Sequence, residues 1–222
     1  MDQNVILVET VPLEFDLESL GCRLRIRPGQ TKFMDRLSRL AEEAVRVARP
    51  KAVARLCGLT ILDEENVQVG EVTFSSPLLR QKMDGLGRAF PYLASEGTEL
   101  ADWSLSLSSS LEQVFASALR EVAVQQAENL LERTLLERYG IAQVSAMNPG
   151  SLKVWSLEEQ VPLFELLAPL PEKLGVTLLP SLMMRPEYSV SGVFFQTDSK
   201  FYNCQLCPKK ECPNRRTPSL VT

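Results

Sequence analysis

Two long stretches of the chain repeat their apolar residues at the three- and four-residue spacing of an amphipathic helix. The first runs from Thr31 to Arg49 and ends at a proline. The second runs from Leu111 to Tyr139, where Gly140 is a typical helix stop. Ser109 and Glu112 have the spacing of a capping box at its start. We therefore predict two long helices that each present an apolar face to a core.

Shorter segments rich in β-branched and aromatic residues predict strands. These are Val5–Phe15, Ala52–Leu62, Val67–Phe74, Ala89–Ala94 and Ser189–Phe195. A short helix is predicted over Pro77–Met83. A second capping-box pattern, Ser156 with Glu159, opens another helical segment, in which Pro162 requires a kink or a later start.

The elements come in mixed order, without regular strand-helix-strand alternation. This order favours an α+β fold in which a mixed or antiparallel sheet packs with long helices. No internal repeat or low-complexity linker divides the chain. We predict a domain over residues 1–202, followed by a cysteine-containing tail over residues 203–222.

Composition narrows the chemistry that the chain can carry. It contains no histidine, which excludes Ser-His-Asp and Cys-His catalysis and any imidazole ligand from this chain. A net charge of -4 and a pI near 5.2 argue against a general nucleic-acid binder. No apolar run is long enough to span a membrane, and the acidic start is unlike a signal peptide, so we expect a cytoplasmic protein.

Three of the five cysteines lie close together, as Cys204-x2-Cys207-x4-Cys212. In a cytosolic chain this clustering favours metal over disulfide. An iron-sulfur cluster is one interpretation and zinc is another, each with a fourth ligand from Cys22, Cys57, a partner or solvent. Three free thiols in the tail are the third.

A series of motifs between Pro149 and Tyr202 resembles the reactivation domain of cobalamin-dependent methionine synthase. Glu137-Arg138-Tyr139 resembles a run that precedes the same region. The matching residues are the Pro149-Gly150 turn, Leu163-Phe164-Glu165-Leu166-Leu167, Met184, Pro186, Ser189-Val190-Ser191-Gly192, Phe195 and Asp198-Ser199-Lys200-Phe201-Tyr202.

The resemblance implies a domain that binds S-adenosylmethionine and closes over a corrinoid, so that oxidised cobalt is reduced and remethylated. The candidate binding residues that it implies are Glu137, Asn148, Gly150, Ser151 and Tyr202. The family's Arg-x-x-x-Gly-Tyr motif is altered here. Ala146 replaces the arginine that meets the ligand carboxylate, and Ser151 replaces the tyrosine.

The predicted function is an accessory role in the reductive reactivation of a corrinoid-dependent methyltransferase, with no catalytic residue of its own. The partner is that methyltransferase or a corrinoid protein, with a ferredoxin- or flavodoxin-like protein as electron donor. Cobalamin would come through the partner. Cys204 follows Tyr202 closely, so a redox centre at the cysteines would lie beside the ligand. The alternative is a non-catalytic adaptor that binds a corrinoid protein and carries structural zinc or no metal.

Overall fold

The computed structural model describes residues 3–209, 212, 215 and 217–220. The described helices are α1 (Leu17–Arg23), α2 (Thr31–Val47), α3 (Pro77–Lys82), α4 (Thr98–Ser106), α5 (Ser110–Tyr139), α6 (Gln160–Leu167) and α7 (Leu170–Leu174). Two 3-10 turns are η1 (Leu157–Glu159) and η2 (Asn203–Leu206). Within the described residues, no helix combines the length and the hydropathy that a membrane crossing requires.

The strands form an antiparallel sheet around β6, which pairs with β2 and β3 on one side and with β10 on the other. β1 extends the sheet beyond β2, and β7 extends it beyond β10. A separate small ladder joins β8 to β9. The strands are β1 (Val5–Val8), β2 (Lys51–Arg55), β3 (Cys57–Ile61), β4 (Asn66–Val69), β5 (Val72–Ser75), β6 (Arg88–Ser95), β7 (Val144–Met147), β8 (Thr177–Leu178), β9 (Met184–Arg185) and β10 (Ser189–Gln196).

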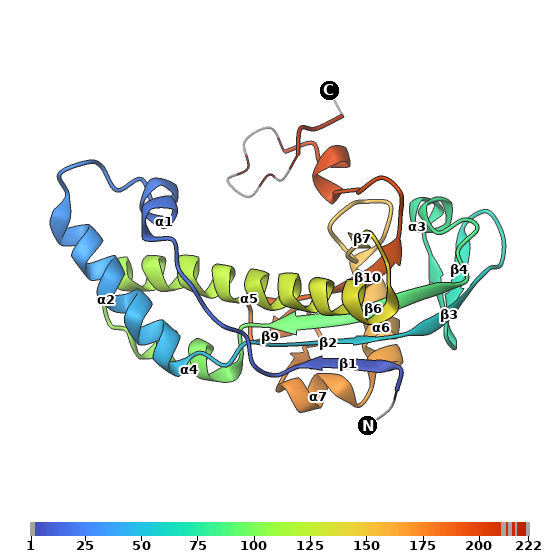
Figure 1. The fold of residues 1–222 in the computed structure, drawn as a ribbon, viewed down its shortest axis with the longest axis horizontal. Coiled ribbons are helices and arrows are strands. Elements are labelled where there is room, and N and C mark those ends of the chain that lie inside the picture. The colour runs from blue at the N-terminus through green and yellow to red at the C-terminus, as the bar shows by residue number, and fades with distance from the viewer. Residues whose placement is uncertain (1–2, 210–211, 213–214, 216, 221–222) are drawn as a thin grey trace.

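Helices cover both faces of the sheet. α5 runs along one face (Figure 1), where Ala127, Leu131 and Leu135 pack against Phe90 and Phe194. The opposite face carries a second apolar cluster, to which α3, α6 and α7 contribute. A third cluster joins α1, α2 and α4 to the first half of α5, at the end of the molecule remote from β3 and β4 (Figure 1). The α+β class with an antiparallel sheet and long helices is confirmed.

Two predicted strands are each two strands in the structure. Ala52–Leu62 divides at Leu56, whose amide donates to the Asn4 carbonyl at 2.7 Å, so that β2 pairs with β1 and β3 turns away to pair with β4. Val67–Phe74 is a hairpin of β4 and β5. Gly70 adopts φ +61° in its two-residue loop, a conformation that favours glycine.

Three other sequence predictions were wrong in detail. The strand expected over Val5–Phe15 ends at Val8. At the start of α5 the Ser109 side chain forms no cap, because Glu112 pairs instead with two arginines of α2. The Ser156 side chain likewise does not cap the following turn, since its hydroxyl donates to Glu158, and Glu159 accepts the Ser75 amide at 3.2 Å.

Candidate functional site

A pocket of about 200 Å³ opens between α5, the ends of β7 and β10, and the segment that follows β10. We call it the inner pocket. It combines two carboxylates, a lysine, two amides, three aromatic side chains and a thiol. The lining residues are Glu128, Glu132, Ala146, Asn148, Val190, Phe194, Lys200, Phe201, Tyr202, Asn203 and Cys204.

A chain of hydrogen bonds runs from α5 across the sheet into this pocket. The Tyr92 hydroxyl donates to Glu128 Oε1 at 2.7 Å and accepts from Asn148 Nδ2 at 2.7 Å. Asn148 Nδ2 also donates to the Ser191 carbonyl at 2.9 Å, and Asn203 Nδ2 donates to Asn148 Oδ1 at 3.0 Å. Both amide orientations are thereby fixed, so the polar groups of the pocket are held in place before any ligand arrives.

The chain ends on an acceptor without a donor. Asn203 Oδ1 is buried and has no hydrogen-bond partner among the described residues. A buried polar atom of this kind costs free energy unless a ligand or water satisfies it. Asn203 lines the inner pocket, but this oxygen is shielded from it, so a ligand contact to Oδ1 would require the side chain to move.

Gly192 of β10 permits this arrangement. A Cβ atom at this position would lie 2.6 Å from Asn148 Nδ2 and 2.9 Å from Tyr92 Cε1. The Tyr92 ring also stacks on Phe194 with centroids 3.9 Å apart. Glycine is thus needed where the Asn148 side chain crosses the sheet.

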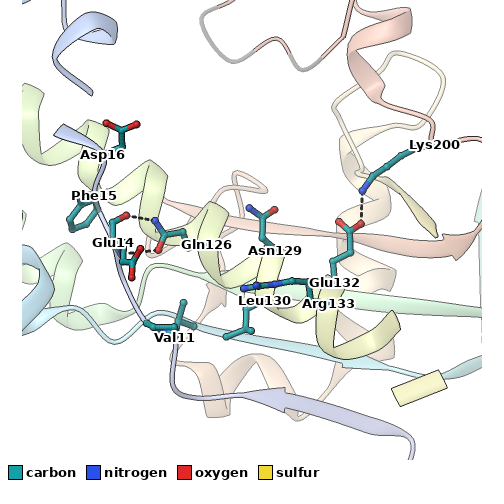
Figure 2. Close-up of a pocket in the computed structure, with 11 residues that line it drawn as sticks. Val11, Glu14, Phe15, Asp16, Gln126, Asn129, Leu130, Glu132, Arg133 and Lys200 are labelled. Atoms are coloured by element: carbon teal, nitrogen blue, oxygen red, sulfur yellow. Dashed lines mark hydrogen bonds and ion pairs between the residues drawn. The ribbon is translucent and has the colours of Figure 1, made fainter. Parts of the chain in front are cut away.

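A larger groove of about 900 Å³ shares Glu132 and Lys200 with the inner pocket, and Figure 2 shows side chains that line this groove. It lies between α5 and the extended segment that precedes α1, which Gln126 holds by accepting from the Glu14 amide at 3.1 Å and donating to the Glu14 carbonyl at 2.5 Å. We call it the helix groove. Its lining residues are Val11, Pro12, Glu14, Phe15, Asp16, Gln126, Asn129, Leu130, Glu132, Arg133 and Lys200.

One ion pair belongs to both cavities. Lys200 Nζ donates to Glu132 Oε1 (Figure 2), and the two side chains are 31% and 20% exposed. The Lys200 ammonium also lies 5.7 Å from the centroid of the Tyr202 ring, within the range of a cation–π contact. Glu132 and Lys200 thus form the wall that the inner pocket and the helix groove share.

The structure brings two of the five candidate binding residues into one cavity, since both Asn148 and Tyr202 line the inner pocket. Gly150 and Ser151 are exposed and lie outside both cavities. Gly150 adopts φ +76°, and a Cβ atom there would lie 2.7 Å from Leu157, so this glycine turns the chain. Glu137 is also exposed and lines neither cavity.

Sequence reasoning did not identify the carboxylates and the lysine of the pocket. Glu128 and Glu132 are four residues apart, so they share one face of α5, and this spacing is visible in the sequence. Lys200, the partner of Glu132, stands in a motif that carried the family resemblance. The sequence does not show that this face of α5 contacts the motif that contains Lys200.

Two described residues of the C-terminal tail, Arg215 and Ser219, contact the backbone near the cysteines. Arg215 donates from its guanidinium to the Cys204 carbonyl at 3.0 Å and from its amide to the Cys212 carbonyl at 3.2 Å. The Ser219 hydroxyl donates to the Cys207 carbonyl at 3.1 Å. Arg215 and Ser219 together therefore contact the backbone carbonyls of all three cysteines, and Cys204 also lines the inner pocket.

The cysteine thiols do not form a ready metal site in this structure. Within residues 3–209, 212, 215 and 217–220, no three acidic, cysteine or histidine side chains are grouped to hold an ion. Of the two candidate fourth ligands, Cys22 is exposed on α1, and Cys57 is buried on β3. Burial raises the pKa of the Cys57 thiol, against a lowering effect of Arg55, which disfavours the thiolate. Residues 210–211, 213–214, 216 and 221–222 of the predicted tail lie outside the described residues.

Comparison with known proteins identifies the fold of this chain. Neither the protein-family models nor the curated proteins contain a match to the sequence. Among solved structures, the chain is similar to the MetH reactivation domain bound to AdoHcy, with a TM-score of 0.61 and 17% sequence identity. The similarity covers 89% of this chain and 80% of that chain. The chain therefore has the fold of the MetH reactivation domain, as the motifs between Pro149 and Tyr202 predict.

Proposed function

We propose that the protein binds S-adenosylmethionine or AdoHcy in the inner pocket and serves the reactivation of a corrinoid-dependent methyltransferase. The observation that carries the proposal is that Asn148 and Tyr202, which the family resemblance assigns to the ligand, line one cavity together with Asn203 and two carboxylates. The solved domain of the same fold is bound to AdoHcy.

The residues of the pocket fit such a ligand. An adenosyl group carries amino and hydroxyl donors for the polar residues that line the pocket, and it has a ring face for the aromatic surface of Tyr202 and Phe194. The pocket also holds the carboxylates of Glu128 and Glu132. A sulfonium cation is favoured beside carboxylates, which suits the charged methyl donor.

The role of this chain is to bind and orient. The corrinoid of the partner would supply the cobalt that accepts an electron and then the methyl group. The inner pocket would hold the methyl donor at a fixed position relative to the cobalt, so that methyl transfer would not depend on a random collision of the two. A ferredoxin- or flavodoxin-like protein would supply the electron.

The binding proposal is tested by titration calorimetry with AdoHcy and S-adenosylmethionine. Loss of the ring in Tyr202→Leu should weaken binding by about 1–3 kcal/mol, the usual contribution of an aromatic side chain stacked on a base. Ser151→Ala is the matched control, because Ser151 is exposed and outside the pocket. Equal losses in the two variants would place the ligand elsewhere.

We also propose that Cys204, Cys207 and Cys212 hold an iron-sulfur cluster, with zinc as the alternative metal. The supporting observation is that Arg215 and Ser219 contact the backbone of all three cysteines. The thiols would have to converge when the metal binds, as metal ligands commonly do. A cluster at Cys204 would stand at the edge of the ligand pocket, where an electron is needed.

Metal and sulfide analysis of protein purified without oxygen distinguishes these metals. Iron with matching sulfide, lost in Cys207→Ser and kept in Cys22→Ser, supports the cluster. Zinc in place of iron supports a structural site. A protein that holds neither metal nor AdoHcy and still binds a corrinoid protein would be the non-catalytic adaptor.

A further inference from the structure

The size of the inner pocket limits how much of a ligand it can hold. Its volume of about 200 Å³ is below the roughly 300–1,000 Å³ of cavities that enclose a drug-sized molecule. The helix groove adds about 900 Å³ on the other side of the wall formed by Glu132 and Lys200. A nucleoside with a long substituent that enters the inner pocket must therefore extend past this ion pair into the groove.

The ion pair is chemically complementary to an α-amino acid. The Lys200 ammonium has three N–H donors, and the Glu132 carboxylate has two acceptor oxygens, so their mutual contact leaves capacity on both. An α-amino acid group carries a carboxylate and an ammonium on one carbon. Its carboxylate can accept from Lys200 while its ammonium donates to Glu132, which leaves no charge unpaired.

No other described cation lines both cavities. Ala146, which stands where the resembling family has its carboxylate-binding arginine, presents only a methyl group to the inner pocket. Arg133 lines the helix groove but not the inner pocket, and it forms no ion pair with a described residue. Lys200 is therefore placed to bind the carboxylate of a ligand substituent that extends from the inner pocket into the helix groove.

We propose that Lys200 binds the carboxylate, and Glu132 the ammonium, of the amino-acid arm of the ligand. This inference rests on the proposed nucleoside site. The pair acts as a specificity determinant, and it selects nucleoside thioethers and sulfonium compounds that carry a free α-amino acid over those that lack it.

The test compares two ligands that differ in this arm. AdoHcy carries it, whereas 5′-methylthioadenosine keeps the nucleoside and the thioether without it. Calorimetry on the full chain should show that Lys200→Met weakens AdoHcy about tenfold to a hundredfold, the usual effect of losing a hydrogen bond to a charged group. Binding of 5′-methylthioadenosine should stay unchanged. Lys200→Arg should restore most of the AdoHcy affinity, and Glu132→Gln should weaken AdoHcy selectively.

The control is Lys173→Met, which removes an exposed lysine of α7 that lines neither cavity. Equal loss of both ligands in Lys200→Met would overturn the inference while leaving the nucleoside site in place. A selective loss in Arg133→Met, with Lys200→Met unaffected, would also overturn it and assign the arm to the helix groove alone. If the wild-type chain binds neither ligand, the proposed function and this inference fall together.

Discussion

A buried ion pair at the end of β6 allows a quantitative test of how α5 is fixed to the sheet. Arg120 of α5 donates to both carboxylate oxygens of Glu96, at 2.6 and 2.7 Å. The Glu96 side chain is fully buried and also accepts the Tyr188 amide at 3.3 Å. The Arg120 guanidinium lies 4.5 Å from the centroid of the Tyr188 ring. The pair thus joins the helix, the strand and the segment that leads into β10.

Replacement of Arg120 by methionine keeps the apolar stem and leaves the Glu96 carboxylate buried with one backbone donor. Breaking a buried pair in this way costs about 3–5 kcal/mol, which is a large part of the roughly 5–15 kcal/mol by which a domain is stable. The double variant Glu96→Gln with Arg120→Met removes the buried charge. It should recover at least about 2 kcal/mol of the loss.

The pH dependence gives a second criterion. Burial raises the pKa of the Glu96 carboxyl, and its hydrogen bonds and charge interaction with Arg120 oppose that rise. Without Arg120 the pKa rises further, so ionisation of Glu96 opposes folding, and the penalty grows as pH rises through the folded-state pKa. The stability gap between wild type and Arg120→Met should therefore be smaller at pH 5 than at pH 8, whereas the stability of the double variant, which lacks the Glu96 carboxyl, should not change with pH through this group.

Urea denaturation followed by circular dichroism at several pH values measures these gaps. A loss of less than about 1 kcal/mol in Arg120→Met, or a gap that does not change with pH, would refute the reasoning. A double variant as unstable as Arg120→Met would show that Arg120 stabilises the fold through packing rather than through the charge of Glu96.

Three further changes test other parts of the structure. Gly192→Ala should destabilise the chain by about 1–3 kcal/mol, because its new methyl group would clash with the Met147 carbonyl and lie 2.6 Å from the Asn148 amide, and calorimetry should show weaker AdoHcy binding. The Arg36 hydrogen bond lowers the pKa of Glu112, so wild type should lose stability as pH falls through that pKa, and Glu112→Gln should show a flatter stability curve in acid urea titrations. Burial and a raised pKa should make Cys57 unreactive toward thiol reagents until the chain unfolds, which mass spectrometry of labelled protein can follow.

The sequence predicted best those helices and strands whose apolar residues recur regularly along the chain. α2, α5 and β10 lie within one or two residues of the predicted bounds, because each presents a long apolar face. α4 was not predicted, since Leu100 and Ser104 are its buried residues and its apolar pattern is weak. The capping boxes were wrong because the carboxylate that fits a cap in the sequence can be taken by a distant partner, as Arg36 takes that of Glu112.

In the candidate site, too, the sequence predicted some residues, whereas others come together only through the packing of distant elements. Asn148 and Tyr202 were predicted because they stand in or beside motifs that resemble a known family. The Glu132–Lys200 pair joins residues 68 positions apart, and only the packing of α5 beside the end of β10 brings them together. Gly150 and Ser151 were predicted from the altered motif; they lie outside the inner pocket, and Gly150 adopts the positive φ of a turn.

The length of α5 has a consequence for how the molecule opens. Its first half supplies Phe115, Leu119 and Ala123 to the cluster with α2, and its second half supplies Leu131 and Leu135 to the cluster on the sheet. Because one continuous helix belongs to both clusters, we expect the two clusters to open together. Amide hydrogen exchange should therefore show one cooperative unit that includes α1, α2, α4 and the sheet. All of α5 should have a single opening free energy.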